Sequence, residues 1–206
     1  MAEKIDISDL KQISFSDKSV KLFTQALADP ASKLGLGSAA ALSAAQAAAL
    51  ALGAVRCCPS DELSKTDADL EKLMTYFIHL IDEENKAKLP LEKRLGKDNV
   101  PEEEIEAGYR TACIIVDEIL YSSLALIDVL DAASDKLCGC VAAQCAAAVY
   151  FAKNAMEGVR LQLAYYSTKM NEEVYAHTTR REPEIAMEGA KDKIDKLIAK
   201  FEARIV

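Results

Sequence analysis

The fold is decided by the stretch Leu34-Gly35-Leu36-Gly37-Ser38-Ala39-Ala40-Ala41-Leu42, which continues as an alanine-rich segment to Val55. Gly35 and Gly37 permit backbone torsions that other residues avoid, so they predict a loop. Ser38 stands where a helix N-cap is expected, because its hydroxyl can accept a hydrogen bond from a free backbone N–H group. The alanines that follow are small, so neighbouring elements can approach the backbone closely. The stretch therefore predicts a binding loop that leads into a buried helix.

Composition and net charge limit the kinds of partner that such a loop can bind. The chain has 206 residues, half of them hydrophobic, which is enough for one domain with a full core over residues 1–206. Its formal net charge is −8, and no cluster of lysine or arginine stands out, so we expect no nucleic-acid partner. The first residues contain no apolar core flanked by basic residues, so they do not resemble a secretory signal, and we expect a cytoplasmic protein.

The apolar segment from Ala39 to Val55 approaches the length of a membrane span. It consists mostly of alanine and includes Ser43 and Gln46, so it gains little from transfer into lipid. We therefore expect a core helix and no association with a membrane.

The rest of the chain carries apolar residues at helical spacing and no convincing strand. Helices are predicted from a Ser16 N-cap to Pro30, from a capping box of Thr66 and Asp69 to Pro90, from about Glu102 to Leu130, from Leu137 to Tyr166, and from Ile185 to Ile205. The polar stretch from Lys86 to Glu106, with Pro90, Gly96 and Pro101, is predicted to be a loop or broken connection. The sequence thus predicts an all-α bundle of about six helices, in which the alanine-rich helices are central.

Six cysteines raise the question of disulfides and metal sites. Four of them fall in predicted apolar helices, where cysteine packs as a small hydrophobe: Cys113, Cys138, Cys140 and Cys145. Without an export signal, we expect reduced thiols. The pair Cys138 and Cys140 could bind a soft metal, but no second pair of ligands has suitable spacing, so no metal site is predicted.

Several segments resemble, in order, the cyclodeaminase/cyclohydrolase family. The first matched segments are Ser19-Val20-Lys21-Leu22-Phe23 and Ala26-Leu27-Ala28. The glycine loop that follows is similar to the family's Pro-Gly-Gly-Gly-Ser-Ala-Ala-Ala-like loop. The family's acidic helix segment is similar to the stretch from Leu80 to Ala87. Its late helix, with Val-Ala-Ala and an Asn-Val-Arg-Ile-Asn-Leu-like end, is similar to Val141-Ala142-Ala143 and the stretch from Gly158 to Leu163. The resemblance spans about residues 16–167.

This family includes the cyclodeaminase domain of formiminotransferase-cyclodeaminase and stand-alone methenyltetrahydrofolate cyclohydrolases. The resemblance implies an all-helical fold, a homodimer, and a tetrahydrofolate derivative as substrate or ligand rather than a tightly bound cofactor. It also exposes departures: Leu34 replaces a proline, Leu36 replaces a glycine, and Lys88 replaces a phenylalanine. Counted back from Val159 without gaps, Gly139-Cys140 replaces the family's Ser-Asp step.

Ser134-Asp135 lies shortly before that position, and it would restore the Ser-Asp pair only if the alignment were gapped. A shift of this size changes the face of a helix on which a residue lies. The simpler interpretation of Ser134-Asp135 is a turn between two helices, because serine and aspartate suit turns.

Folate chemistry needs a proton-transfer group near the reacting nitrogens, a carboxylate for the pterin and a cation for the glutamate tail. The candidate catalytic residues are Asp82, Glu84 and, by its aligned position, Cys140. The candidate ligand-binding residues are Gly35, Gly37, Ser38 and Arg160. The alternative is that the acidic residues form a solvated face, whereas Arg160, in an apolar stretch, needs a partner or a route to water.

Other polar and aromatic residues have simpler explanations. Glu83, Lys33 and Arg56 are further charges that a folate could use, while His79, Tyr165, Tyr166 and Tyr175 are expected to be packed or surface residues outside the site.

Two functions therefore remain open. The chain is either an enzyme of one-carbon folate metabolism, a methenyltetrahydrofolate cyclohydrolase or a formiminotetrahydrofolate cyclodeaminase, or a catalytically degraded homologue that binds a ligand or a protein. The departures at Leu36 and Cys140 favour the second, and the retained glycines and helix order favour the first. Titration with tetrahydrofolate derivatives would distinguish them, since binding without turnover favours the degraded homologue.

Overall fold

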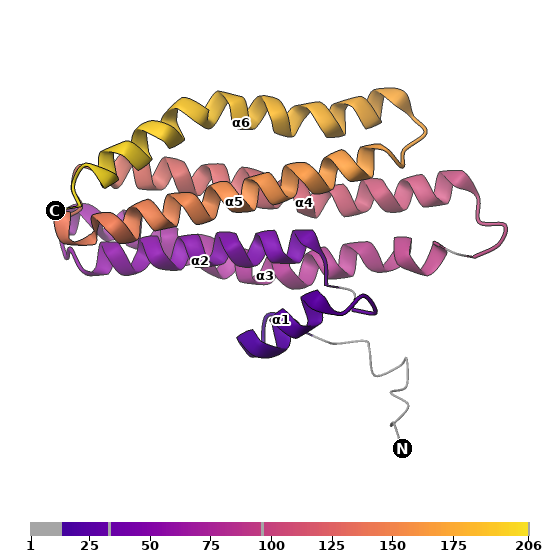
Figure 1. Ribbon diagram of the computed structural model, residues 1–206, viewed down its shortest axis with the longest axis horizontal. Coiled ribbons are helices and arrows are strands. Elements are labelled where there is room, and N and C mark those ends of the chain that lie inside the picture. Colours follow the sequence, from indigo (N-terminus) through magenta and orange to yellow (C-terminus); the bar gives the residue numbers. More distant parts are fainter. Residues whose placement is uncertain (1–13, 33, 96, 206) are drawn as a thin grey trace, which may run out of the picture.

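The protein is a bundle of long helices (Figure 1). A computed structural model describes residues 14–32, 34–95 and 97–205. These residues form six α-helices and two short 3-10 helices and contain no strand. The α-helices are α1 (Val20–Ala28), α2 (Leu36–Arg56), α3 (Ser64–Arg94), α4 (Glu102–Ala133), α5 (Ala142–Ser167) and α6 (Glu173–Glu202). The 3-10 helices are η2 (Asp61–Leu63) and η3 (Gly139–Val141). The predicted all-α architecture is confirmed.

The helices α2 to α6 run along the long axis of the molecule, and α1 lies outside them (Figure 1). Helix α2 packs against α3 and α5, α4 packs against the same two helices, and α6 covers α5. The α2–α3 connection, the start of α5 and the C-terminal end of the chain meet at one end of the bundle (Figure 1).

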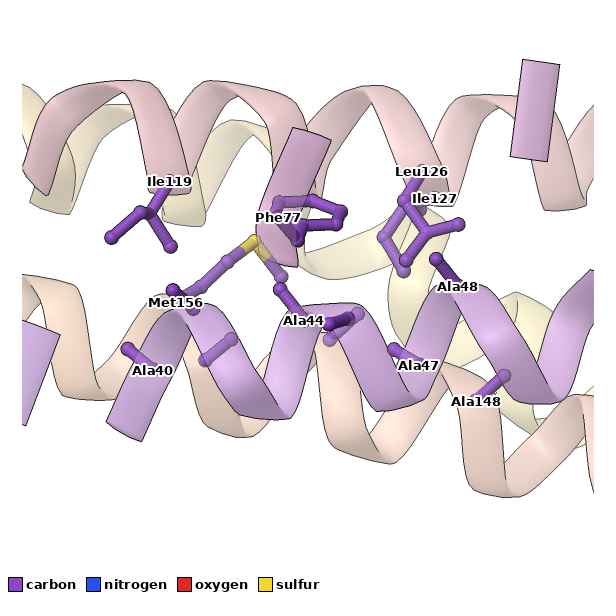
Figure 2. Close-up of a cluster of buried hydrophobic side chains, with 14 of the residues drawn as sticks. Ala40, Ala44, Ala47, Ala48, Phe77, Ile119, Leu126, Ile127, Ala148 and Met156 are labelled. Atoms are coloured by element: carbon purple, nitrogen blue, oxygen red, sulfur yellow. The ribbon is translucent and has the colours of Figure 1, made fainter. Parts of the chain in front are cut away.

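Alanines line α2 where it crosses the core. Ala44, Ala47 and Ala48 have no exposed surface, and they lie among Phe77 of α3, Ile127 of α4 and Met156 of α5 (Figure 2). Small side chains let α2 approach its neighbours closely, and the larger residues of α3, α4 and α5 fill the remaining space. Helix α2 is long and apolar enough to cross a membrane, but 67% of its most apolar window is buried inside the protein. This burial supports its interpretation as a core helix.

Two predicted helix starts are wrong, each for its own reason. Helix α1 begins at Val20, and its cap is Ser19, whose Oγ accepts a hydrogen bond from the Leu22 N–H at 3.3 Å. Ser16 instead donates its hydroxyl to Asp82 on α3. Helix α3 begins at Ser64 rather than at the capping box, because the 3-10 helix η2 leads directly into it.

Two prolines do not end the helices that contain them. Helix α3 continues through Pro90 to Arg94, so residues 86–94 are helical and the prediction of a loop there is wrong. Pro90 removes one backbone hydrogen bond, but the next residue, Leu91, is buried against α4 at Gly108. Helix α6 begins at Glu173, earlier than predicted, and continues through Pro183, which is itself buried. Gly96, part of the predicted loop, lies outside the described residues.

The segment before α5 also differs from the prediction. Residues 137 and 138 precede the 3-10 helix η3, and α5 begins only at Ala142, so Cys138 and Cys140 do not lie in an apolar α-helix. Cys58 and Cys138 form a disulfide, which corrects the expectation of reduced thiols for this pair. The bond forms because the end of α2 and the start of η3 meet at the same end of the bundle. Cys113 and Cys145 are buried free thiols in helices, as expected.

Candidate functional site

The first turn of α2 places Ser38 in the interior. Gly35, not Ser38, occupies the N-cap position, so the predicted capping role of Ser38 is wrong. The Ser38 side chain has no exposed surface, and its Oγ donates a hydrogen bond to Glu84 Oε2 at 2.6 Å. A buried hydroxyl needs a partner, and a carboxylate on the facing helix provides a stronger acceptor than a neutral group.

Glu84 is the centre of a buried polar cluster. Lys88, one turn further along α3, lies with Nζ 3.0 Å from Glu84 Oε1, and the two side chains are 10% and 1% exposed. Gln162 of α5 donates its Nε2–H to the same oxygen at 3.1 Å. Together with Ser38 and Tyr166, these residues form what we call the Glu84 cluster. A buried carboxylate is stable only when it is paired and hydrogen-bonded, and here three helices meet that requirement.

Tyr166 extends the cluster along α5. Gln162 Nε2 also donates to Tyr166 Oη at 2.8 Å, and the Tyr166 ring meets the Tyr109 ring edge-on with 5.5 Å between centroids. Burial raises the pKa of Tyr166 well above its ordinary value, so its phenol stays neutral. Gln162 Oε1 is buried and has no hydrogen-bond partner among the described residues. The cluster therefore holds one unused acceptor beside a carboxylate.

The two loop glycines lie against this cluster. A Cβ added at Gly37 would stand 2.8 Å from Glu84 Cδ and from Gln162 Oε1, and one added at Gly35 would stand 2.8 Å from Lys88 Nζ. Gly35 has an extended backbone with φ of −134°, so the expectation of unusual torsions is wrong there. Close approach of α2 to the cluster, rather than backbone conformation, explains the need for glycine at these positions.

Leu36, the departure between the glycines, does not fill the space beside Glu84. It is 46% exposed, and its Cδ1 lies 3.6 Å from the position of a Cβ added at Gly158 on α5.

Asp82 has a different role from its neighbour Glu84. Its Oδ1 accepts hydrogen bonds from the backbone N–H groups of Phe15 (2.6 Å) and Ser16 (3.3 Å), and its Oδ2 accepts from the hydroxyls of Ser14 (3.0 Å) and Ser16 (2.7 Å). Burial alone would raise the pKa of Asp82, but these bonds outweigh it and lower the pKa. Asp82 thus anchors the segment before α1 to α3.

Arg160 and Cys140 lie away from the Glu84 cluster. Arg160 forms an ion pair with Glu157 at 2.8 Å and lines a cleft between α5 and α6. Cys140 is exposed in η3, at the end of the bundle where α2 ends, whereas Ser38 lies where α2 begins. A helix of this length spans about 30 Å, so Cys140 does not take the place of a carboxylate near Glu84 in the same chain.

The remaining candidates are accounted for by surface contacts. Asp135 is exposed in the turn after α4 and pairs with Lys200 at 2.8 Å, which confirms the turn interpretation of Ser134-Asp135. His79, Glu83 and Arg56 form exposed pairs with one another or with α3, and Tyr175 lies under Arg110. Lys33 lies outside the described residues.

Sequence reasoning did not select Lys88, Gln162 or Tyr166 as site residues. The available signal was spacing, because Glu84 and Lys88 are one helical turn apart, as are Gln162 and Tyr166.

The family of the chain follows from a comparison of sequences. The family described as formiminotransferase-cyclodeaminase matches residues 19–184, a range that contains the whole Glu84 cluster. The chain belongs to this family. A solved structure, that of formiminotetrahydrofolate cyclodeaminase from Thermotoga maritima, is similar in fold, with a TM-score of 0.74 and 13% identity over 92% of this chain and 96% of that chain. None of the curated proteins compared with the chain matches it.

Proposed function

We propose that this member of the formiminotransferase-cyclodeaminase family acts on a tetrahydrofolate derivative at the Glu84 cluster, as a methenyltetrahydrofolate cyclohydrolase or a formiminotetrahydrofolate cyclodeaminase. The observation that carries the proposal is the buried Glu84 carboxylate, in contact with Lys88, Ser38 and Gln162 at the first turn of α2. Membership of the family and the similarity to the Thermotoga maritima cyclodeaminase support the same substrate class.

Both reactions need a proton to be moved at the folate nitrogens. In hydrolysis of a methenyl bridge, a water oxygen bonds to the bridging carbon, one carbon–nitrogen bond breaks, and the water loses a proton. In cyclodeamination, the exocyclic folate nitrogen bonds to the formimino carbon, the bond from that carbon to the imino nitrogen breaks, and the imino nitrogen leaves as ammonia after gaining a proton. Glu84 provides a carboxylate that can accept a proton, and Lys88 provides an ammonium that can donate one.

The surroundings of Glu84 suit an aromatic ligand with N–H groups. The unused Gln162 Oε1 can accept a hydrogen bond from such a group. The N-terminal turn of α2 adds a favourable electrostatic environment for a carboxylate or for developing negative charge. Lys88 is the more exposed member of the ion pair, so we expect its flexible side chain to move toward solvent when a ligand enters.

The test is turnover by the purified protein and by two matched variants. We expect Glu84→Gln to lower the rate with methenyltetrahydrofolate or formiminotetrahydrofolate by about 10²–10⁴-fold, the range for loss of a general acid or base. Glu83→Gln is the control, because Glu83 is the adjacent residue and pairs with Lys86 at the surface. Equal rates for Glu84→Gln and the unchanged protein would contradict the proposal.

A catalytically degraded homologue is the second candidate. One observation favours it: Glu84 is buried, and its two oxygens already contact Ser38, Lys88 and Gln162. In that case, calorimetry would detect binding of methenyltetrahydrofolate without hydrolysis, or no binding at all if the partner is a protein.

We also propose that the protein forms a homodimer through the exposed apolar residues near the Glu84 cluster. Leu161 and Tyr165 lie one turn apart on α5 and are 53% and 56% exposed, and Leu36 lies against Gly158, one turn before Leu161 on the same helix. A second copy of this chain would bury the same surface of both partners.

A further inference from the structure

Three sulfur atoms gather at the end of the bundle opposite the Glu84 cluster. Cys58, just after α2, is bonded to Cys138, and the Cys138 backbone N–H donates to Cys58 Sγ at 3.2 Å. Cys140 Sγ lies 2.9 Å from Cys138 Sγ, and Cys140 is exposed. A free thiol thus contacts the sulfur of an existing disulfide.

The other free cysteines lack this arrangement or this access. Cys113 and Cys145 are buried in helices, where burial raises the pKa of Cys113 to about 12 and that of Cys145 to about 11, so both stay protonated. Cys57 is exposed beside Cys58 and serves as a natural comparison.

We propose that Cys58, Cys138 and Cys140 form a thiol–disulfide exchange site, in which the disulfide moves between a Cys58–Cys138 and a Cys138–Cys140 pairing. The Cys140 thiolate attacks Cys138 Sγ, a bond forms between these two sulfurs, and the Cys138–Cys58 bond breaks. The electron pair leaves on Cys58 Sγ, which takes up the proton that Cys140 lost to solvent. The exchange involves no net oxidation or reduction, so it needs no oxidant or reductant.

The two pairings differ in what they connect. In the first, the disulfide ties the end of α2 to the start of η3 across 80 residues of sequence. In the second, it closes only the three-residue loop around Gly139 and leaves Cys58 as a free thiol. A bond that closes a long loop constrains the unfolded chain more than one that closes a short loop, so the exchange removes a long-range restraint from this end of the bundle.

The test is peptide mapping of the full-length protein. The protein is held without reductant at about pH 8, which favours thiol–disulfide exchange, and free thiols are then blocked with iodoacetamide. Trypsin cleaves after Arg56, Lys65, Lys136 and Lys153, so Cys58 and Cys138 fall on different peptides, whereas Cys138 and Cys140 share one. We expect both bridges, together with alkylated Cys58.

Two variants identify the attacking thiol. We expect Cys140→Ser to retain the Cys58–Cys138 bridge and to lose both the second bridge and the alkylated Cys58, whereas Cys57→Ser retains both bridges. A single Cys58–Cys138 bridge in the unchanged protein would overturn the proposal, as would an alkylated Cys58 that persists in Cys140→Ser or a second bridge that is lost in Cys57→Ser. Complete alkylation of all three cysteines would also overturn it, and zinc released on unfolding would then assign a metal site instead.

Discussion

At the scale of single residues, Gly37 shows how the site depends on the absence of a side chain. Gly37→Ala would place a Cβ 2.8 Å from Glu84 Cγ, Glu84 Cδ and Gln162 Oε1, inside a packed cluster. We expect the free energy of unfolding to fall by about 1–3 kcal/mol, the usual cost of overpacking, and folate binding to weaken. Urea denaturation and ligand titration measure the two effects.

Gly35→Ala is the matched control for Gly37→Ala. Its added Cβ would meet Lys88 Nζ, the far end of a flexible side chain that can shift. We expect a smaller loss of stability than for Gly37→Ala. Equal losses for the two variants would contradict the close-approach explanation.

Asp117 on α4 makes the free energy of unfolding depend on pH. Burial, and to a lesser extent repulsion from Glu182, raises its pKa to about 6. A carboxyl group with a raised pKa stabilises the fold when it is protonated, below its unfolded pKa of 3.8, and this stability is lost as the pH rises through about 6. We expect Asp117→Asn to raise the free energy of unfolding by on the order of 1–2 kcal/mol at pH 7 and to have little effect at pH 4. A gain of the same size at both pH values would contradict this assignment.

The residues of the Glu84 cluster were only partly predictable. The acidic run of residues 82–84 follows Leu80 and Ile81 directly, so at least one carboxylate near the buried boundary was expected. Lys88 was noted only as a departure from the family's sequence, and Gln162 only as part of the matched late helix. Lysine and glutamine are usually exposed, and no local sequence feature identifies the few that are buried. Their burial depends on α2, α3 and α5 meeting, which the local pattern does not encode.

At the scale of elements, the alanines of α2 set the distance between helices. Ala48 has no exposed surface and lies beside Leu126 and Ile127 of α4 (Figure 2). We expect Ala48→Leu to lower the free energy of unfolding by about 1–3 kcal/mol, because the added atoms must displace packed neighbours. Ala49→Leu, on the exposed side of the same helix, is the control and should change it by less than about 0.5 kcal/mol. Thermal unfolding of both variants provides the measurement, and similar losses would contradict the role of α2 as a tightly packed core helix.

Helix existence was predicted better than helix bounds. The helices corresponding to α2 and α4 were predicted closely at one end or both, since each has a sustained apolar pattern. Pro90 misled the prediction, because a proline costs one hydrogen bond and a local clash, whereas the burial of Leu91 that offsets this cost arises only in the assembled bundle. The predictions of Ser16 and Ser38 as helix N-caps were wrong for a similar reason, because their partners come from another part of the chain. Both hydroxyls donate to carboxylates on α3 rather than accept from backbone N–H groups.

At the scale of the whole molecule, the sequence predicted the fold class and the family, but not which segments meet. Cys58 and Cys138 are 80 residues apart in sequence and come together only because α2 and η3 meet at one end of the bundle. The same long-range geometry separates Cys140 from Glu84, two residues that had been grouped as catalytic candidates. Alignment along a chain gives the order of motifs, and the helix directions decide which motifs share a site.

The proposed homodimer is the prediction that belongs to this scale. The apolar surface of α2 is mostly buried inside one chain, so the structural support for a dimer is the exposed apolar surface of Leu36, Leu161 and Tyr165. We expect light scattering to give a mass of about twice the 22.4 kDa of one chain, and Leu161→Arg to shift it to that of a single chain, because two like charges would face each other across a two-fold interface.

Val20→Arg is the control for Leu161→Arg, since Val20 lies on α1 and is 80% exposed. It should leave the dimer mass unchanged. If Leu161→Arg remains dimeric with an unchanged helical circular dichroism spectrum, the interface lies on another face of the bundle. If the unchanged protein is already monomeric, the Glu84 cluster of one chain must account for any folate turnover.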